Sequence, residues 1–160
     1  MTERMLIPLD GSKVGEAALY YIARLLDKLE PGHMPEIILF HVVQRQIEHI
    51  NVEGGVVDIY DSSQDIESVI ASAMIYLNKS AETLIKKGAT VTCKIALNDT
   101  GASSAEKIID AETELNIDMV AMSTHGRRGI SRWAYGSVTG KVLSSGHVPV
   151  LMVRVKKDEL

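Results

Sequence analysis

Cysteine is almost absent from this sequence, and long apolar runs are absent altogether. The single cysteine, Cys93, excludes a disulfide within one chain and any zinc site built from several cysteines. A reducing cytosol suits this composition best. The apolar runs are far shorter than the roughly 20 residues that a membrane-spanning helix needs. We therefore expect no membrane segment.

Positive charge is also scarce, because 17 lysines and arginines stand against 21 acidic residues and leave a formal net charge of −4. A general nucleic-acid binder needs a dominant basic surface to meet the phosphate backbone. We therefore expect no nucleic-acid partner, while a local basic loop is still compatible with this charge. With 160 residues, of which 46% are hydrophobic and 24% charged, the sequence predicts one globular domain over residues 1–160.

The two ends of the sequence do not predict export. The first residues reach Pro8 and Asp10 before a long apolar stretch can form, so we expect no secretory signal. The last four, Lys157 to Leu160, match an ER-retention address, which acts only on a chain that enters that compartment. We interpret them as a charged C-terminus that follows the last strand, and we expect cytoplasmic localisation.

Apolar runs and amphipathic stretches alternate along the sequence. The runs predict buried strands, and the stretches with apolar residues at helical spacing predict helices. Ser12 is a predicted N-cap, and Ser103 with Glu106 forms a capping-box pair. The predicted elements, in order, are strand 5–9, a helix from Ser12 to about Leu29, strand 37–43, helix 64–87, strand 90–97, a helix from Ser103 to Leu115, strand 118–123, helix 137–145 and strand 148–155.

This alternation predicts a parallel sheet, because each right-handed crossover covers a sheet face with a helix. The expected fold is a doubly wound α/β domain with a five-stranded sheet in the order 3-2-1-4-5 and helices on both faces. Residues 44–62 show no clear period, and we interpret them as a flexible excursion or a lid. Ligands bind such sheets beyond the carboxyl ends of the strands, where the winding reverses. The loops after strands 5–9 and 118–123 are then expected to face one crevice.

The loop after strand 118–123 has the residue types of an anion site. Gly126, Gly129 and Gly136 allow a ligand to approach the backbone closely. Gly136 leads straight into a predicted helix, whose first N–H groups are unpaired and carry the positive end of the helix dipole. Neighbouring hydroxyls and arginines suit a phosphate group. An ordinary solvated glycine loop is the alternative interpretation.

Two well-known phosphate motifs do not fit these loops. A Walker A loop ending at Gly140 and Lys141 needs glycine where Tyr135 stands and serine or threonine where Val142 stands. The first turn after a strand reads DGSKVG, which is not the G-x-G-x-x-G of dinucleotide-binding folds. A different kind of nucleotide loop is indicated.

The chain resembles the universal stress protein family over nearly its whole length, from the PLDGS turn after the first strand to VPVLMV near the end. The most specific likeness is to the family's nucleotide motif, G-x2-G-x9-G-[ST]. Its positions fall on Ser123, Gly126, Gly136 and Ser137, with serine in place of the first glycine and the spacing intact. The resemblance implies an adenine nucleotide alpha hydrolase-like fold.

The resemblance also implies an ATP site. In it, Asp10 contacts the ribose or nearby polar groups, the Val42 backbone holds the adenine, and residues 136–139 bind the phosphates, with Gly126 and Arg127 lining the approach. It implies Mg²⁺ or Mn²⁺ carried by the phosphates, and no metal site made by the protein. The predicted nucleotide-binding residues are Pro8, Asp10, Val42, Met122, Ser123, His125, Gly126, Arg127, Gly129, Gly136, Ser137, Val138 and Thr139.

Several of these residues have a second interpretation. Asp10 is also a common turn former before Gly11. His125 has no acid or nucleophile paired with it by motif, so we expect it on the phosphate side of the site or in a structural role. Trp133 and Tyr135, within the motif's spacer, either pack the loop down or form part of a partner surface.

The function that these residues favour is an ATP-binding regulatory or stress-response protein. A slow ATPase on the same fold is one alternative, but the absence of a Walker A loop and of a recognisable carboxylate base argues against an enzyme, and we assign no catalytic residue. A nucleotide-free dimeric interaction module is the other alternative. Strand 148–155 is expected at a sheet edge, and the resemblance implies a homodimer formed through it.

Overall fold

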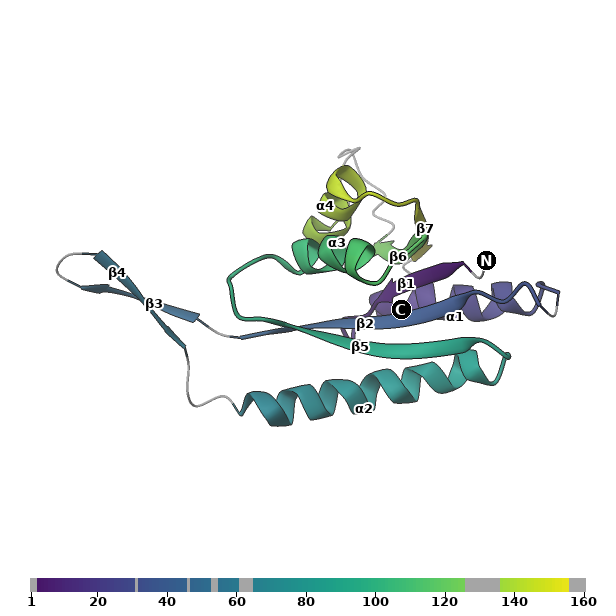
Figure 1. Cartoon of the computed structure of the whole chain (residues 1–160), viewed down its shortest axis with the longest axis horizontal. Coiled ribbons are helices and arrows are strands. Elements are labelled where there is room, and N and C mark those ends of the chain that lie inside the picture. Colours follow the sequence, from purple (N-terminus) through teal and green to yellow (C-terminus); the bar gives the residue numbers. More distant parts are fainter. Residues whose placement is uncertain are drawn as a thin grey trace.

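The computed structural model describes residues 3–30, 32–45, 47–52, 55–60, 65–125 and 136–155. Strands and helices alternate as the sequence patterns predict, apart from two additional strands within residues 47–60 (Figure 1). The elements are β1 (Arg4–Pro8), α1 (Lys13–Leu26), β2 (Glu36–Gln44), β3 (Ile47–Val52), β4 (Gly55–Tyr60), α2 (Ile66–Ile85), β5 (Thr90–Asn98), α3 (Ser104–Glu114), β6 (Met119–His125), α4 (Ser137–Ser145) and β7 (Val150–Val155).

Five of the strands form one parallel sheet in the order β5-β2-β1-β6-β7. This confirms the predicted order 3-2-1-4-5. The winding reverses between β1 and β6, which are neighbours although far apart in sequence. The predicted boundaries differ slightly, since α1 ends at Leu26 and β7 begins at Val150.

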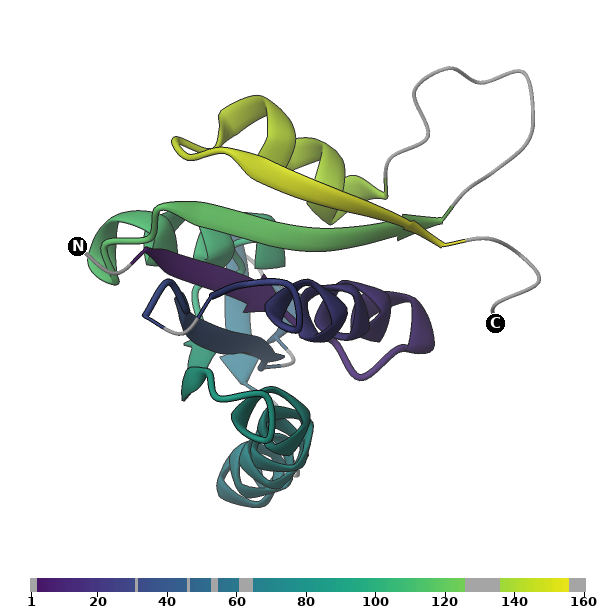
Figure 2. The same cartoon turned by 90° about the vertical axis from the view of Figure 1, so that its right-hand side faces the viewer.

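Each strand of the sheet sends alternate side chains to opposite faces, so each face has its own core. Ile7 of β1 and Leu39 of β2 pack with Leu19 of α1 and Leu84 of α2 on one face. On the opposite face, Leu6, Ile38 and Val120 pack with Ile108 of α3 and Val142 of α4. Figure 1 shows α3 and α4 on one side of the sheet and α2 on the other, and Figure 2 shows α4 near β7 and α2 near β5, at the two ends of the row of strands. The sheet is therefore covered on both faces, as a doubly wound fold requires.

Residues 44–62 contain regular structure that the sequence analysis missed. Strands β3 and β4 pair antiparallel, from Ile47↔Tyr60 to Val52↔Gly55, and form a separate two-stranded sheet. Figure 1 shows this hairpin extending beyond the ends of β2 and β5. Two β-rich runs separated by a glycine-containing pair were a hairpin signal. Whether the segment acts as a lid stays a prediction.

Side chains at the start of α3 fix its position against α4. Ser103 Oγ accepts from the Glu106 amide at 3.3 Å, and Glu106 Oε2 accepts from the Ser103 amide at 2.7 Å, which confirms the predicted capping box. Lys141 Nζ of α4 lies 2.7 Å from Glu106 Oε1. The hydrogen bond from Lys141, aided by those from Ser103, lowers the pKa of Glu106 to about 2. The carboxylate therefore stays charged and joins the two helices at neutral pH.

A buried carboxylate fixes the other end of α4. Glu112 of α3 is 2% exposed, and its Oε2 accepts from the His147 amide at 2.6 Å. Its Oε1 has no hydrogen-bond partner in the described part of the chain. Gly146 lies against this oxygen, so the turn from α4 into β7 is closely packed.

Within the described ranges, no helix is both long and apolar enough to span a bilayer.

Candidate functional site

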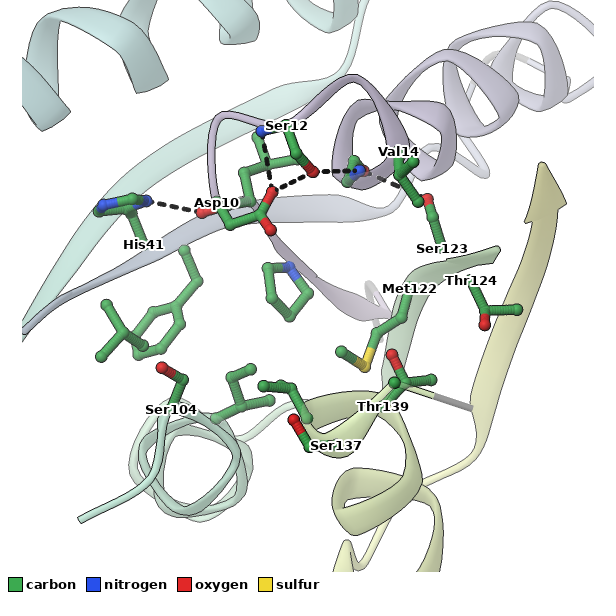
Figure 3. A pocket seen from close by; sticks show the side chains of 18 residues that line it. Asp10, Ser12, Val14, His41, Ser104, Met122, Ser123, Thr124, Ser137 and Thr139 are labelled. Atoms are coloured by element: carbon green, nitrogen blue, oxygen red, sulfur yellow. Dashed lines mark hydrogen bonds between the residues drawn. The ribbon is translucent and has the colours of Figure 1, made fainter. Parts of the chain in front are cut away.

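A cavity of about 350 Å³ lies at the carboxyl ends of β1, β2 and β6 (Figure 3). It stands where the winding of the sheet reverses, which is the expected place for a ligand in this kind of fold. Most of the predicted nucleotide-binding residues lie along its wall. These are Pro8, Asp10, Val42, Met122, Ser123, Gly136, Ser137, Val138 and Thr139.

The structure does not test the other four predicted residues as parts of the cavity wall. His125 is the last residue of β6, directly after the lining residue Thr124. Gly126, Arg127 and Gly129 lie outside the described residues, as do Trp133 and Tyr135. The roles that we assigned to these residues stay predictions.

Three helices begin at this cavity, and their first turns differ in how they are capped. Ser12 Oγ accepts from the Gly15 amide of α1 at 3.0 Å, and α3 has its capping box. The N-cap of α4 is Gly136, which has no side chain, and no side chain among the described residues caps this helix. The first intrahelical bond of α4 runs from the Gly140 amide to the Gly136 carbonyl at 2.8 Å. The earlier N–H groups of α4 are therefore suited to bind an anion from the cavity.

Asp10 closes the turn after β1 and also lines the cavity. Its Oδ1 accepts from the Ser12 amide at 2.9 Å and from the Ser12 hydroxyl at 2.6 Å, which closes the turn after β1. The other carboxylate oxygen points toward the cavity (Figure 3). Asp10 is thus both a turn former and an acceptor that a ligand in the cavity can reach.

Gly15 is a site residue that sequence reasoning missed. A Cβ at this position would stand 2.5 Å from Asp10 Oδ1 and 3.3 Å from Ser12 Oγ. Any larger residue would therefore displace the Asp10 carboxylate from its turn. No short motif reveals this role, because it depends on how the turn folds back over the first turn of α1.

Val42 directs its backbone N–H and C=O toward the cavity because β1 and β2 separate beyond Pro8. The β1–β2 register ends at Pro8↔Phe40, followed by one bond from the Leu9 amide to the Phe40 carbonyl at 2.8 Å. Successive residues of a parallel strand direct their N–H and C=O groups to alternate neighbours. Val42 therefore directs its backbone groups to the side that β1 has left, while β2 stays paired with β5 through Val42↔Ala96. The cavity thus has one backbone donor beside one acceptor.

His41 holds the end of β1 in place from the same wall. Its Nδ1 lies 2.7 Å from the Leu9 carbonyl oxygen, and because a carbonyl can only accept, Nδ1 carries the hydrogen. The ring meets Tyr76 edge to face at 6.4 Å between centroids. Tyr76 donates to Glu16 Oε1 at 3.2 Å, and burial together with the Glu16 charge raises the pKa of Tyr76 to about 12. Tyr76 therefore stays protonated and keeps donating.

Ser123 stands where the motif has its first glycine, and its side chain binds helix α1. Ser123 Oγ accepts from the Ala18 amide at 2.7 Å and donates to the Gly15 carbonyl at 3.2 Å. The hydroxyl is therefore already engaged, and Ser123 offers mainly its backbone to the cavity. The other lining residues that the sequence did not single out are Leu9, Ser12, Val14, Phe40, Ser104, Ile108 and Thr124.

Comparison with known proteins gives a consistent result. The model of the universal stress protein family matches residues 1–154. Universal stress protein MJ0577 of Methanocaldococcus jannaschii is 26% identical over 163 residues, which cover 99% of this chain and 98% of that protein. The solved structure of MJ0577 matches this fold with a TM-score of 0.68 at 21% identity, over 98% of this chain and 99% of that one.

Two further solved structures hold nucleotides. A universal stress protein from Archaeoglobus fulgidus, in complex with dAMP, has a TM-score of 0.61 at 15% identity and covers 95% of this chain and 97% of that one. A universal stress protein in complex with cAMP has a TM-score of 0.63 at 14% identity, with 96% and 97% covered. At these identities the likeness shows the fold alone.

Proposed function

Because this chain belongs to the universal stress protein family, we propose that it binds ATP in the cavity at the carboxyl ends of β1, β2 and β6. In this proposal it acts as a nucleotide-dependent regulatory protein of the stress response. The observation that carries the proposal is the start of α4, which lines the cavity and has no side-chain cap from any residue that the structure describes. A helix start of this kind is a ready site for phosphate.

The parts of ATP match the chemistry of the cavity walls. The adenine has an amino donor beside an acceptor nitrogen, which complements the carbonyl and amide of Val42. The cavity-facing oxygen of Asp10 suits a ribose hydroxyl. Ser137 and Thr139 add hydroxyls to the amides at the start of α4. Relatives of the same fold solved with dAMP and with cAMP support the choice of an adenine nucleotide.

The metal in this proposal is Mg²⁺ or Mn²⁺, bound to the phosphates. Among the described residues, no group of three histidine, cysteine, aspartate or glutamate side chains lies close enough to hold a metal ion. In this proposal the hydroxyls of Ser137 and Thr139, at the start of α4, lie beside the phosphates that hold the ion. The ion would neutralise phosphate charge, and we assign no catalytic step to any residue of this chain.

The assembly and location follow from the same proposal. Strand β7 pairs only with β6 in the described part of the sheet, so one edge of it is open to a second strand. We propose a homodimer formed through residues 148–155, in the cytoplasm, which suits the free thiol of Cys93. Sedimentation equilibrium should then give twice the chain mass of 17.5 kDa, and a monomer at micromolar concentration would contradict the dimer.

Calorimetry with ATP and Mg²⁺ tests the function directly. We expect saturable heat with one site per chain, and an adenine nucleotide among the small molecules that acid releases from protein purified without added nucleotide. No released nucleotide and no heat would leave the nucleotide-free interaction module as the better reading. Steady release of phosphate from the bound ATP would instead favour the slow ATPase.

A further inference from the structure

The side chain of Ser104 lines the cavity at the first residue of α3, across from Asp10 (Figure 3). We infer that Ser104 is a specificity-determining residue, whose hydroxyl donates a hydrogen bond to an acceptor ring nitrogen of the bound base. This inference rests on the proposed function, because it concerns the same cavity. It follows from a chain of side-chain hydrogen bonds that begins behind the cavity wall.

The chain begins at Asn98, the last residue of β5, which is 1% exposed. Asn98 Nδ2 donates to the carbonyl of Ala102, and a backbone carbonyl can only accept. Asn98 Oδ1 in turn accepts from the Thr100 hydroxyl at 3.3 Å. These two partners fix the orientation of the buried amide, so the nitrogen, and not the oxygen, faces Gln44.

The orientation of Asn98 determines that of Gln44, at the end of β2. Asn98 Nδ2 donates to Gln44 Oε1 at 2.6 Å, which requires the oxygen of the Gln44 amide on that side. The Gln44 nitrogen then faces α3, where Nε2 donates to Ser104 Oγ at 2.8 Å. Each residue therefore donates to the next one, from the buried amide of Asn98 to Gln44, and from Gln44 to Ser104 in the cavity wall.

Ser104 is the last link, and its oxygen is used as an acceptor. A hydroxyl group has one hydrogen to donate and two lone pairs that accept. Gln44 directs its donor nitrogen at Ser104, so Gln44 does not accept the Ser104 hydrogen. No described residue accepts the Ser104 hydrogen in the structure. The hydroxyl hydrogen can thus turn to the cavity, and the ligand atom that receives this hydrogen has to be an acceptor.

The surroundings of Ser104 suit a base. Ile108, one turn further along α3, and Phe40 and Val42 of β2 line the cavity and belong to one apolar cluster, which suits the faces of a planar ring. Adenine has only acceptors among its free ring nitrogens, at N1, N3 and N7, whereas guanine and hypoxanthine carry a hydrogen on N1. A donor fixed at Ser104 therefore selects an unprotonated ring nitrogen.

Calorimetry with ATP and its 1-deaza, 3-deaza and 7-deaza analogues tests this inference, because each analogue replaces one ring nitrogen by C–H. We expect the wild type to bind two of the three about tenfold more weakly than ATP, because the Val42 amide and the Ser104 hydroxyl each lose a ring-nitrogen acceptor in one of them. Ser104→Ala should bind ATP about tenfold more weakly, and one of those two analogues no worse than ATP. Thr113→Ala, on the exposed side of the same helix, is the control and should behave as the wild type.

Gln44→Glu tests the role of the relay while leaving the size of the side chain unchanged. A carboxylate at position 44 accepts from both Asn98 and Ser104. The Ser104 hydrogen then points to residue 44, and a lone pair of Ser104 Oγ faces the cavity in its place. This variant should lose the same part of the discrimination among the deaza analogues as Ser104→Ala does, and keep the part that belongs to the Val42 amide. A wild type that binds ATP but discriminates against at most one analogue, or a Ser104→Ala variant that keeps the full wild-type discrimination, would overturn the inference alone. A wild type that binds no ATP would overturn the proposed function as well.

Discussion

Replacing Gly136 with valine is expected to abolish ATP binding while leaving the fold intact. A Cβ at Gly136 would meet no described atom within 4 Å apart from its chain neighbours, so the chain itself has room for the side chain. The added methyl groups would instead occupy the space in front of the first amides of α4. Loss of two hydrogen bonds to a charged phosphate weakens binding by on the order of a hundredfold or more.

Calorimetry with ATP and Mg²⁺, together with thermal unfolding, checks this expectation. Valine is a poorer N-cap than glycine, so a loss of about 1 kcal/mol in unfolding free energy is expected from the cap alone. Gly136→Ala is the graded control, since a single methyl should weaken binding less than valine does. If Gly136→Val binds ATP with wild-type affinity, the phosphates do not lie at the start of α4.

Replacing Gly146, at the other end of α4, with alanine is expected to destabilise the protein by about 2–3 kcal/mol, as overpacking at a closely packed position does. Its φ of −71° is available to any residue, so the effect is steric. A Cβ at Gly146 would stand 2.6 Å from the Val142 carbonyl oxygen and 2.7 Å from Glu112 Oε1. Neither atom can retreat, because one is helix backbone and the other belongs to a buried side chain that binds the His147 amide.

Urea unfolding measures this effect, and Gly136→Ala is again the matched control. The two glycines flank the same helix, but only Gly146 is enclosed by other atoms. Gly136→Ala should therefore lose about 1 kcal/mol at most. Equal unfolding free energies for the two alanine variants would show that the α4–β7 turn relaxes without cost and that Glu112 does not hold it rigidly.

The order of the sheet could be predicted because it follows from features that are local in the sequence. Short apolar runs such as 37–43 mark strands buried on both faces, and the handedness of crossovers then limits the possible orders. The hairpin of β3 and β4 was missed because its runs mix polar and apolar residues and so show no clear period. The glycine-containing pair between the runs is also common in ordinary loops.

The candidate site could be predicted in part for the same reason. The start of α4 and the turn at Asp10 are each visible within a few residues of sequence, and both line the cavity. Gly15, His41 and Ser104 were not found, because their roles depend on partners that only folding brings near. Ser104, for example, receives its hydrogen bond from Gln44, which is 60 residues away in the chain.

Ser123 has a consequence for how the crevice can move. The register of β1 and β6 covers Met5↔Met119 and Leu6↔Val120, so this pairing stops short of the carboxyl ends of both strands. The Ser123 hydroxyl on β6 accepts a hydrogen bond from the Ala18 amide and donates one to the Gly15 carbonyl of α1. A glycine at this position has no side chain with which to do so. The corner of the crevice nearest Asp10 therefore cannot widen without breaking two hydrogen bonds.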